Sequence, residues 1–349
     1  MNEPVMDLMR RYRFKKLLLL DDAETGLRAV IAIHSTALGP ALGGTRFHQY
    51  DDADEALTDV LRLARGMSYK AAIAGLELGG GKAVILGDPD TTRTDELILA
   101  YGRFVDLLGG AYVTAEDVGT TQADMDLIRS VTPHVTGVSE ALGGSGDPSP
   151  ATAVGVVHAM RAAAAHRFGS DDLAGLHVAI SGVGKVGGAL VGHLVAAGAR
   201  VTIADLDPER SAEVAASPDV EVVPPARAHT VVCDVFSPCA LGGTLNAETI
   251  PELRCAIVCG SANNQLLEPA DGDRLAAAGV LYVPDYVANA GGIINIAEEV
   301  HGYDARRAAQ RIAAIRTTTT EVLELAEASG TTPAEAADHL AEQRIAAGR

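Results

Sequence analysis

Apolar and polar positions follow two different patterns along this chain, and the change between them divides the sequence. Up to about residue 110, helical and strand patterns are mixed. Asp54–Lys70 repeats apolar residues every three or four positions, as an amphipathic helix does, whereas Leu27–His34 is a mostly apolar run typical of a buried strand. From His177 onward strands and helices alternate regularly, which predicts a parallel, doubly wound sheet. We therefore predict an α/β protein.

The remaining elements follow from the same patterns and from the glycines and prolines that interrupt them. In the first part we expect a glycine-rich turn at Leu78–Lys82, strands at Ala83–Leu86 and Tyr112–Ala115, and a helix at Thr94–Leu108. In the second part we expect helices at Ala151–His166 and Lys185–Ala197, and strands at His177–Ser181, Arg200–Ala204, Val220–Val223, Thr230–Phe236, Arg254–Cys259 and Val280–Val283. Beyond Asp304 we expect two helices, separated by Gly330–Pro333.

A segment rich in glycine, serine and proline, Gly143–Pro150, is the best candidate for a hinge. A chain of 349 residues is long enough for two domains of ordinary size. We predict a first domain over residues 1–145 and a second over residues 146–328. Residues 329–349 are predicted to form a C-terminal helix that packs back on the first domain.

The composition narrows the choice of partners. The formal net charge is -18, so the surface repels nucleic acid and anionic lipid, and neither is expected to bind. The apolar run Leu17–Leu20 is too short for a signal peptide, and no segment has the roughly 18 apolar residues of a membrane span. We predict a cytosolic protein whose four cysteines are reduced and structural. These cysteines form no C-x-x-C pair and have no histidine at zinc-finger spacing, so no metal site is expected.

The strongest motif is a glycine-rich turn between a strand and a helix. Gly182, Val183, Gly184, Lys185, Val186 and Gly187 have the form G-x-G-x-x-G, and Asp205 ends the next strand. The glycines allow a tight turn and a close approach of a pyrophosphate, while the helix N-terminus favours its negative charge. Asp205 can accept hydrogen bonds from ribose hydroxyls and repels a 2′-phosphate. The motif predicts NAD rather than NADP, although Arg210 nearby weakens that preference. The alternative is a Rossmann-like domain that binds no nucleotide.

Lysine and aspartate in the first part suggest proton chemistry. Only five of the 28 basic residues are lysines, and Lys70 and Lys82 both lie in glycine-containing segments. If their ammonium groups met in a buried pocket, desolvation and mutual repulsion would lower a lysine pKa toward the working pH. One lysine would then hold a carboxylate while the other acted as a base. Asp117, at the end of a predicted strand, is a candidate proton carrier. The alternatives are a solvated lysine beside a loop and a turn-forming or helix-capping aspartate.

Longer motifs carry a resemblance to a known family over almost the whole chain. They are Gly39–Arg46, Gly66–Lys70, Gly75–Lys82, Thr114–Thr120, Pro238–Gly243, Gly260–Gln265 and Asn289–Gly292. With these motifs the chain resembles the glutamate/leucine/phenylalanine/valine dehydrogenases, above all the leucine and valine enzymes. The resemblance implies an N-terminal α/β substrate and oligomerisation domain, a Rossmann-type NAD-binding domain and an active-site cleft between them. It also implies a homo-oligomer.

The resemblance implies a role for each matching residue. Lys70 would bind the α-carboxylate of an amino acid, Lys82 would activate water, and Asp117 would move protons to and from the substrate nitrogen. Hydride would pass from Cα to the nicotinamide, and hydrolysis of the imine would give a 2-oxo acid and ammonia, reversibly. Further contacts to the substrate or cofactor are implied for Gly43, Ser149, Thr152, Cys239, Ala240, Asn263 and Asn289.

The side-chain pocket implied by the resemblance excludes glutamate. Glutamate dehydrogenases have a lysine and a serine where this chain has Leu42 and Ile296, so a buried glutamate carboxylate would be unpaired at a cost of several kcal/mol. Leu42, Ala115, Ile293 and Ile296 form an aliphatic wall, which favours valine, leucine or isoleucine. The alternatives are a phenylalanine dehydrogenase, a dehydrogenase of different chemistry such as a 2-hydroxy-acid enzyme, and a catalytically silent NAD-binding protein.

Overall fold

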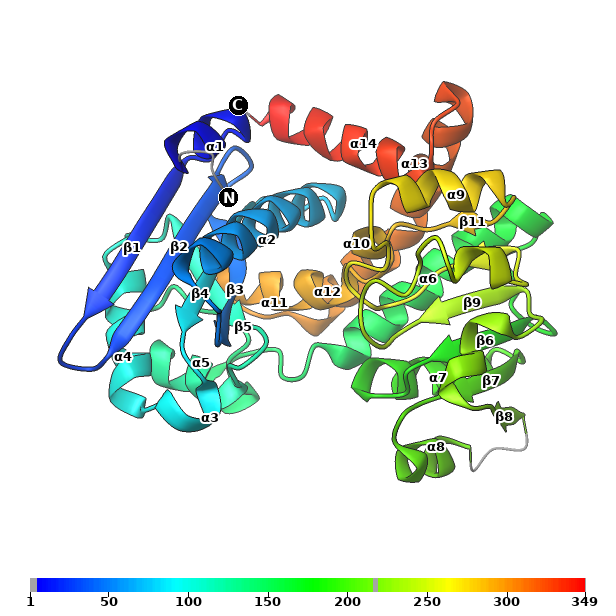
Figure 1. The fold of residues 1–349 in the computed structure, drawn as a ribbon, viewed down its shortest axis with the longest axis horizontal. Coiled ribbons are helices and arrows are strands. Elements are labelled where there is room, and N and C mark those ends of the chain that lie inside the picture. The colour runs from blue at the N-terminus through cyan, green and yellow to red at the C-terminus, as the bar shows by residue number, and fades with distance from the viewer. Residues whose placement is uncertain (1–4, 216–218, 349) are drawn as a thin grey trace. The chain divides into compact units, whose positions relative to one another are not determined.

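The chain forms two compact units (Figure 1), seen in a computed structural model that describes residues 5–215 and 219–348. The first unit holds the described residues up to Asp147, together with Ile296–Ala305 and the residues from Ala341 onward. The second unit holds Pro148–Asn295 and Arg306–Leu340. The first boundary lies two residues after the expected one at 145/146. The return of Ile296–Ala305 to the first unit was not predicted, and only the end of residues 329–349 belongs there.

A five-stranded mixed sheet, in the order β1-β2-β4-β3-β5, forms the centre of the first unit. Its strands are β1 (Lys16–Asp22), β2 (Leu27–Ser35), β3 (Ala41–His48), β4 (Gly79–Leu86) and β5 (Tyr112–Glu116). β3 is parallel to both β4 and β5, whereas β2 is antiparallel to β1 and β4. The helical segments are α1 (Val5–Arg11), α2 (Ala53–Ile73), α3 (Pro89–Thr92), α4 (Asp95–Asp106), α5 (Gln122–Arg129), η1 (Glu140–Leu142) and η4 (Glu298–His301).

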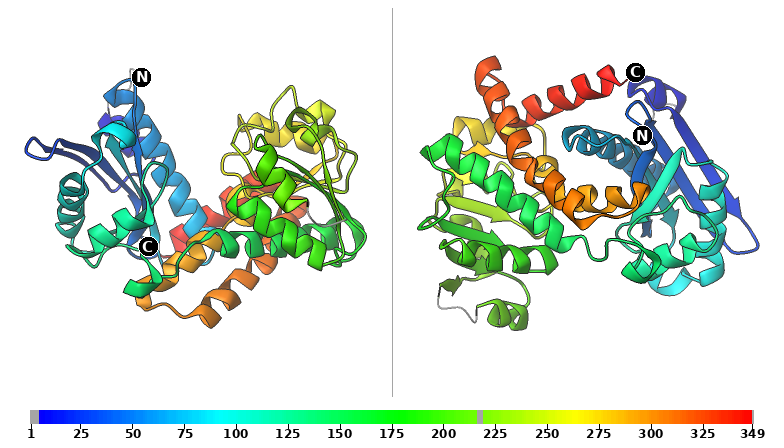
Figure 2. Two further views of the ribbon diagram at one scale, coloured as in Figure 1. Left: turned by 90° about the horizontal axis from the view of Figure 1, so that it is seen from below. Right: turned by 180° about the vertical axis from the view of Figure 1, so that it is seen from behind.

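Helices cover both faces of this sheet (Figure 2). On one face α2 packs Val60 and Ala64 against Val30 and Val84. Its spacing of apolar residues is the helical one expected from the sequence, and Asp52 caps its N-terminus by accepting from the backbone N–H of Glu55. The opposite face is the larger core, formed with α4 and α5, and its largest fully buried side chains include those of Phe47, Tyr101 and Tyr112. The sheet is therefore apolar on both sides.

The glycine-rich segment Leu78–Lys82 was expected to be a turn, but its residues from Gly79 to Lys82 form the first half of β4. Glycine is needed there because neighbouring backbone lies too close for a side chain. A Cβ at Gly79 would lie 1.9 Å from the carbonyl oxygen of Ser35, and one at Gly80 would lie 2.0 Å from the backbone nitrogen of Ser68 in α2. The strands β1 and β3 were also missed, β3 because it contains the pair Gly43-Gly44, which is unusual in a strand interior.

The second unit contains a six-stranded parallel sheet in the order β11-β10-β9-β6-β7-β8. Its strands are β6 (His177–Ser181), β7 (Arg200–Ala204), β8 (Val220–Val222), β9 (Val235–Pro238), β10 (Ile257–Val258) and β11 (Leu281–Tyr282). In chain order within this unit the sheet reads 6-5-4-1-2-3, the Rossmann arrangement, in which ligands bind where the strand order reverses. The predicted parallel, doubly wound sheet is confirmed.

Helices and 3-10 turns precede, connect and follow these strands. They are α6 (Ser149–Phe168), α7 (Lys185–Ala196), α8 (Pro208–Val214), η2 (Pro225–Thr230), η3 (Ile250–Glu252), α9 (Ala270–Ala277), α10 (Asp285–Ala288) and α11 (Gly291–Ala297). The strand expected at Thr230–Phe236 begins only at Val235, because Thr230 closes a 3-10 turn that follows two prolines. The four cysteines are unpaired, as predicted.

Three helices, rather than the expected two, follow residue 304: α12 (Ala305–Ala313), α13 (Ile315–Ser329) and α14 (Pro333–Ala347). The last turns of α14 belong to the first unit. There Arg344 donates hydrogen bonds to the carbonyls of Ala72 (3.2 Å) and Ile73 (2.7 Å) at the end of α2, and Glu342 accepts one from Tyr69. Within residues 5–215 and 219–348, no helix is both long and apolar enough to cross a membrane.

The contacts of Arg344 generate a stability prediction. Arg344→Ala removes a cation and two hydrogen bonds from the C-terminal carbonyls of α2, so the free energy of unfolding should fall by about 1–2 kcal/mol. Arg103→Ala is the matched control, because Arg103 is exposed in the last turn of α4, and its change should stay within about 0.5 kcal/mol. Urea unfolding followed by circular dichroism measures both. Equal stabilities of the two variants would contradict this role of Arg344.

Candidate active site

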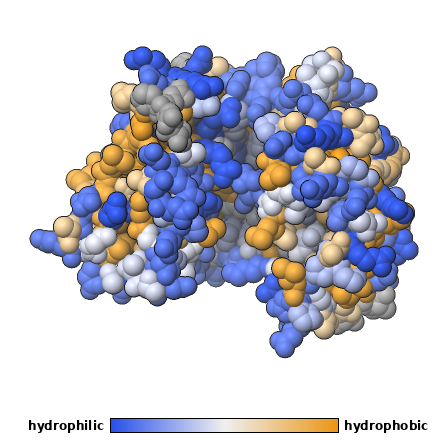
Figure 3. All heavy atoms as spheres, viewed as in Figure 1, coloured by the Kyte–Doolittle hydropathy of each residue, from blue (hydrophilic) through white to orange (hydrophobic). Residues whose placement is uncertain are grey.

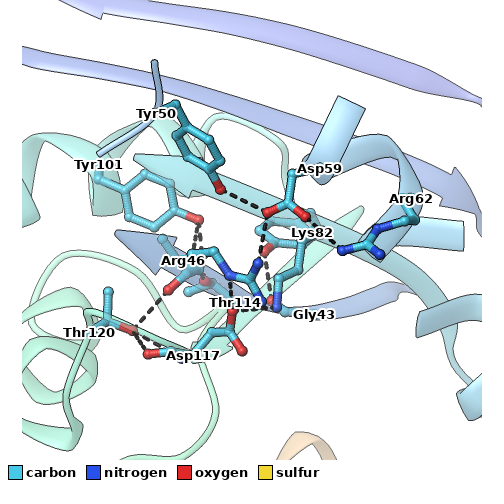
Figure 4. A network of polar contacts seen from close by, with 12 residues as sticks. Gly43, Arg46, Tyr50, Asp59, Arg62, Lys82, Tyr101, Thr114, Asp117 and Thr120 are labelled. Carbon is cyan, nitrogen blue, oxygen red and sulfur yellow. Dashed lines mark hydrogen bonds and ion pairs between the residues drawn. The ribbon is translucent and has the colours of Figure 1, made fainter. Parts of the chain in front are cut away.

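A buried lysine and an aspartate meet at the centre of the first unit (Figure 4). Lys82 lies in β4 and is only 4% exposed, and its Nζ is 2.9 Å from Oδ2 of Asp117. Asp117 directly follows β5. It comes close to β3 because Gly44 has no side chain: a Cβ there would lie 2.9 Å from the Cβ of Asp117. The structure thus brings together two residues that are 35 positions apart in the sequence and were both expected in the active site.

The turn after β5 holds Asp117 in place. Its backbone N–H donates to the hydroxyl of Thr120 (3.0 Å), and that hydroxyl donates to the carbonyl of Thr45 in β3 (2.8 Å). Gly119, with φ of +80°, completes the turn, and a Cβ there would lie 1.9 Å from the carbonyl oxygen of Phe47. These contacts explain why glycine and threonine stand at positions 119 and 120 of the motif Thr114–Thr120.

The strand register places Leu42 and Ala115 on the same face of the sheet as Lys82. Leu42 pairs with Gly80, two residues before Lys82, and Gly44 pairs with Ala115. Because side chains two residues apart point to the same side of a strand, all these positions share the face covered by α2. Two residues of the expected aliphatic wall therefore lie on the face that carries Lys82. Gly43 is held by its carbonyl, which accepts a hydrogen bond from the Tyr112 hydroxyl (2.6 Å).

Lys70 lies on α2, the helix that packs against the strand carrying Lys82. It lies in the last turn of that helix, two residues after Ser68. The hydroxyl of Ser68 is 2.8 Å from Nδ1 of His34, and its backbone packs directly on Gly80. The end of α2 is thereby fixed against β4, close to the strand that carries Lys82.

Burial and neighbouring charges shift the pKa values of the pair. Burial lowers the pKa of Lys82, the charge of Asp117 opposes that shift, and the cation Arg46 adds to it. Burial alone would raise the pKa of Asp117, but the charges of Lys82 and Arg46 outweigh it and lower that pKa. The repulsion on Lys82 thus involves Arg46, whereas the sequence had suggested Lys70. Lys82 has a lysine pKa below the ordinary value, as a general base requires.

The glycine-rich loop of the second unit has the geometry of a dinucleotide site. Gly182 has φ of +95°, and a Cβ there would lie 2.7 Å from the backbone nitrogen of Ala240. A Cβ at Gly187 would lie 2.0 Å from the carbonyl oxygen of Gly182, so α7 packs tightly against the loop. A Cβ at Gly184, in contrast, would meet no atom within 4 Å. Two glycines therefore serve packing, and the third leaves open space at the N-terminus of α7.

A pocket of about 490 Å³ adjoins this loop. It is lined by Ser181, Gly182, Gly184, Ala204, Asp205, Leu206, Asp207, Arg210, Pro225, Cys239, Ala240 and Leu241. Asp205 fixes the loop, because its Oδ2 accepts from the N–H of Val183 (2.7 Å) and its Oδ1 from that of Asp207 (2.9 Å). Burial would raise the pKa of Asp205, but these backbone N–H groups and Arg210 lower it.

The residues of this pocket fit a dinucleotide. The open space at Gly184 can take a pyrophosphate at the positive end of α7, which begins with Lys185 and Val186. Each oxygen of an ionised carboxylate has a second lone pair, so Asp205 can still accept from ribose hydroxyls. Within the described ranges, no group of three or more His, Cys, Asp or Glu side chains is arranged to hold a metal ion.

A second cluster in this unit joins the two expected asparagines. Asn289 donates from Nδ2 to Oδ1 of Asn263 (2.8 Å) and to the carbonyl of Ser261 (3.1 Å). Its own Oδ1 is buried and has no hydrogen-bond partner among the residues described. An unsatisfied buried acceptor of this kind is suited to a ligand donor. Asn263 and Asn289 therefore form a polar pair with one acceptor still available.

The remaining residues expected to contact substrate or cofactor lie at the start of α6 and on α11. Gly291 and Gly292, just after Asn289, pack against the start of α6, where a Cβ at Gly292 would lie 2.6 Å from Oγ1 of Thr152. Ser149 is the first residue of that helix. Ile293 and Ile296 lie one turn apart on α11, so they share a helix face.

Comparison with known proteins identifies the family. Residues 14–134 match the family model "Glu/Leu/Phe/Val dehydrogenase, dimerisation domain", and residues 143–207 and 202–348 match the model "Glutamate/Leucine/Phenylalanine/Valine dehydrogenase". The chain belongs to the glutamate/leucine/phenylalanine/valine dehydrogenase family. The predicted resemblance, the two-domain α/β fold and the class of amino-acid dehydrogenases are thereby confirmed.

Several members of this family resemble the chain over almost its whole length. It is 49% identical to a leucine dehydrogenase of Geobacillus stearothermophilus, covering 97% of this chain and 92% of that protein. It is 51% identical to a valine dehydrogenase of Streptomyces albus, covering 96% and 93%. Among solved structures, L-tryptophan dehydrogenase from Nostoc punctiforme matches with a TM-score of 0.89 and 40% identity, covering 99% of both chains.

One group of residues in this dehydrogenase had not been singled out from the sequence. Arg46, Asp59 and Tyr50 form polar contacts that reach Asp117. Arg46 had been noted only as the end of the motif Gly39–Arg46, and Asp59 only as part of a predicted helix. The available signal was that a charged residue closed a glycine motif beside the expected catalytic groups, but its partner could not be read from a single sequence.

The different roles of the glycines in the loop give a test of the dinucleotide site. Gly184→Val adds a side chain to open space, so the free energy of unfolding should change by less than about 0.5 kcal/mol. Dinucleotide affinity should nevertheless fall at least about tenfold, because the added side chain occupies the pyrophosphate position. Gly187→Val is the contrasting variant and should destabilise the protein by about 2 kcal/mol or more. Calorimetric NAD titration and thermal unfolding measure both; unchanged affinity in Gly184→Val would contradict the site.

Proposed function

We propose that this protein catalyses the NAD-dependent oxidative deamination of a branched-chain L-amino acid to its 2-oxo acid, with release of ammonia, in a reversible reaction. The observation that carries the proposal is the buried Lys82, 2.9 Å from Asp117, on the same sheet face as Leu42 and Ala115. The leucine and valine dehydrogenases to which the chain is about half identical act, by their names, on branched-chain amino acids, and support it.

Three residues of the first unit divide the chemistry between them. Lys70 binds the substrate α-carboxylate, Asp117 accepts a proton from the substrate nitrogen, and Lys82, with its lowered pKa, removes a proton from the water that attacks the imine carbon. When bound, NAD supplies the hydride acceptor. As water adds, the resulting Lys82 ammonium stabilises the negative charge that develops on the substrate, and Asp117 returns a proton to the departing nitrogen.

The cofactor is NAD rather than NADP because of the charge at the end of β7. Asp205 presents a carboxylate where a 2′-phosphate would lie, and like charges repel. Arg210 is 3.5 Å from Oδ1 of Asp205 and 3.4 Å from Oδ2 of Asp207, so its charge is already balanced by two carboxylates. It contributes little to attracting a phosphate. Gly184, Cys239 and Ala240, which line the same pocket, would hold the rest of the dinucleotide. Ser149, Thr152, Asn263 and Asn289 would contact its nicotinamide half.

The residues that we assign to the substrate side chain are all aliphatic. Leu42 and Ala115 on the first sheet and Ile293 and Ile296 on α11 offer no partner for a carboxylate, which excludes glutamate. Two of these residues are β-branched isoleucines, which favours valine, leucine or isoleucine over phenylalanine as the substrate.

The protein acts in the cytosol as a homo-oligomer. The matched family model of its first unit is a dimerisation domain. Strand β1, at the edge of the sheet, carries Leu19, which is 74% exposed. Figure 3 shows apolar side chains gathered over this side of the first unit. An exposed apolar edge of this kind is suited to pairing with another copy.

The role of Lys82 is tested by Lys82→Ala. Deamination should fall at least about a thousandfold, since the variant lacks the general base, while NAD binding to the other unit persists. Arg103→Ala, which removes an exposed cation of α4, is the control and should keep full activity. Initial rates of NADH formation and NAD titrations give both readouts. Full activity in Lys82→Ala would end this mechanistic assignment.

A substrate panel tests the rest of the proposal. With NAD, valine, leucine and isoleucine should each give kcat/KM at least about tenfold above phenylalanine and tryptophan, and glutamate should give no turnover. NADP should replace NAD poorly, and the reverse reaction should require ammonia. Turnover of a 2-hydroxy acid, or NAD binding without turnover of any amino acid, would contradict the proposed function.

A further inference from the structure

Arg46 connects the lysine–aspartate pair to α2 (Figure 4). Its Nε lies 3.1 Å from Oδ2 of Asp117, and its Nη1 lies 2.7 Å from Oδ2 of Asp59. Asp59 comes from α2, the helix that ends at Lys70, and it also accepts a hydrogen bond from the hydroxyl of Tyr50 (2.8 Å). One planar guanidinium thus spans two carboxylates on different elements.

We propose that Arg46 is a positioning residue for the reaction, and that Asp59 anchors it so that one oxygen of Asp117 is fixed against Lys82 and the other faces the substrate nitrogen. This inference rests on the proposed amino-acid dehydrogenation. Arg46 itself touches no reacting atom in this assignment.

The geometry at Asp117 supports this role. The contacts of Lys82 and Arg46 with Asp117 both go to the same oxygen, Oδ2, at 2.9 and 3.1 Å. With only the ammonium of Lys82, the carboxylate could turn and exchange its two oxygens. The second cation approaches from β3, so the orientation of the plane is set by two strands at once. Oδ1 is then the oxygen offered to a substrate, and the side chain of Asp117 keeps 25% of its surface exposed.

The contact with Asp59 explains how Arg46 is itself held. Oδ2 of Asp59 accepts hydrogen bonds from Arg46 and Tyr50, and its Oδ1 forms an ion pair with Arg62 (3.3 Å). Its side chain is only 15% exposed, so these hydrogen bonds are screened less than surface ion pairs. Because an arginine stays protonated in proteins, this chain of contacts carries no proton. Its effect is orientation and charge.

The charged and titratable groups around the pair come from every element packed against it. Arg46 lies on β3, Lys82 on β4 and Asp117 after β5; Asp59 and Lys70 lie on α2, and Tyr50 lies between β3 and α2. Removing the positive charge of Arg46 shifts the pKa values of Asp117 and Lys82 in the same direction. Arg46 lowers the pKa of Asp117, and it also lowers the pKa of Lys82. Without it both pKa values rise.

A pH profile follows from these signs. Deamination requires ionised Asp117 and a neutral Lys82 during water attack, so kcat/KM increases with pH through the relevant pKa. In Arg46→Met, Asp117 and Lys82 both lose their protons at higher pH. The rising part of the plot of kcat/KM against pH (the rising limb) should therefore shift to higher pH by about one unit, whichever of the two residues controls it. At a pH below the limb, this gives about a tenfold loss of kcat/KM.

The matched control is Arg62→Met. Arg62 contacts the same Asp59 but is 65% exposed and makes no bond to Asp117. The rising part of the pH profile of Arg62→Met should coincide with that of the wild type. If Arg46 were only a structural link between β3 and α2, Arg46→Met would lower thermal stability or the active fraction and leave the limb where it is. That outcome would overturn the proposal, and so would an equal shift in Arg62→Met.

A double-mutant cycle tests the anchoring by Asp59. Asp59→Asn should lower kcat by about threefold or more in the wild-type background and have almost no effect in Arg46→Met, because it acts through the arginine. Equal, additive losses in both backgrounds would overturn the anchoring. If Arg46→Met does not fold, Arg46→Lys serves instead. It keeps the charge but cannot span both carboxylates, so its limb should stay within about 0.3 pH unit of wild type while kcat falls, and an unchanged kcat contradicts the proposal.

Wild-type activity separates this inference from the proposed function. If the wild type turns over no amino acid with NAD, the proposed function fails, and with it the positioning role of Arg46 in that reaction. If the wild type is active and its pH limb is unmoved by Arg46→Met, the positioning role alone fails.

Discussion

A protonated lysine inside a protein needs an anion beside it, and this constraint organises the first unit. Removing an ammonium group from water without a partner costs several kcal/mol, so Lys82 requires Asp117 at hydrogen-bond distance. That distance is possible only because the neighbouring backbone positions are glycines, which have no side chain. Gly44 leaves room for Asp117 beside β3, and the glycines that precede Lys82 let β4 lie against α2. The glycine motifs of this family therefore serve to bring strands, a helix and two charges together in a small volume. The same arrangement keeps the lysine at a pKa suited to proton transfer.

The second unit uses glycine in two ways. Gly182 and Gly187 are required by packing, because a Cβ at either would meet backbone atoms well inside contact distance. At Gly184 a Cβ would meet no atom within 4 Å, so packing does not explain this glycine. Its place at the N-terminus of α7, beside the pocket, agrees with the proposed dinucleotide site. Asp205 combines both functions, since it ties the loop to the end of β7 through backbone hydrogen bonds and still has lone pairs for a ribose.

Much of this could be predicted from the sequence, where local pattern decides structure. The strands β6 and β7 were predicted with their observed bounds, and α2 and α7 nearly so, since each has a clear period and a defined end. The segment before Lys82 was mistaken for a turn because glycine usually interrupts strands, and here contacts with Ser35 and Ser68, distant in sequence, override that preference. The pairing of Arg46 with Asp59 and Asp117 was also missed, because these residues are distant from one another in the sequence. Motifs identified Lys82 and Asp117, but no local pattern states which charge lies beside which.

The most direct test of the account is the pKa of Lys82 itself. The chain has only five lysines, so protein labelled with ¹³C at lysine Cε should give five resolvable signals, and the signal absent from Lys82→Ala identifies Lys82. Titration followed by NMR should show Lys82 losing its proton below the ordinary lysine pKa, because burial disfavours its charged form. In Asp117→Asn the pKa of Lys82 should fall further, because the opposing charge is gone. A Lys82 that titrates at the ordinary lysine pKa, in the wild type and in the variant alike, would contradict the central claim.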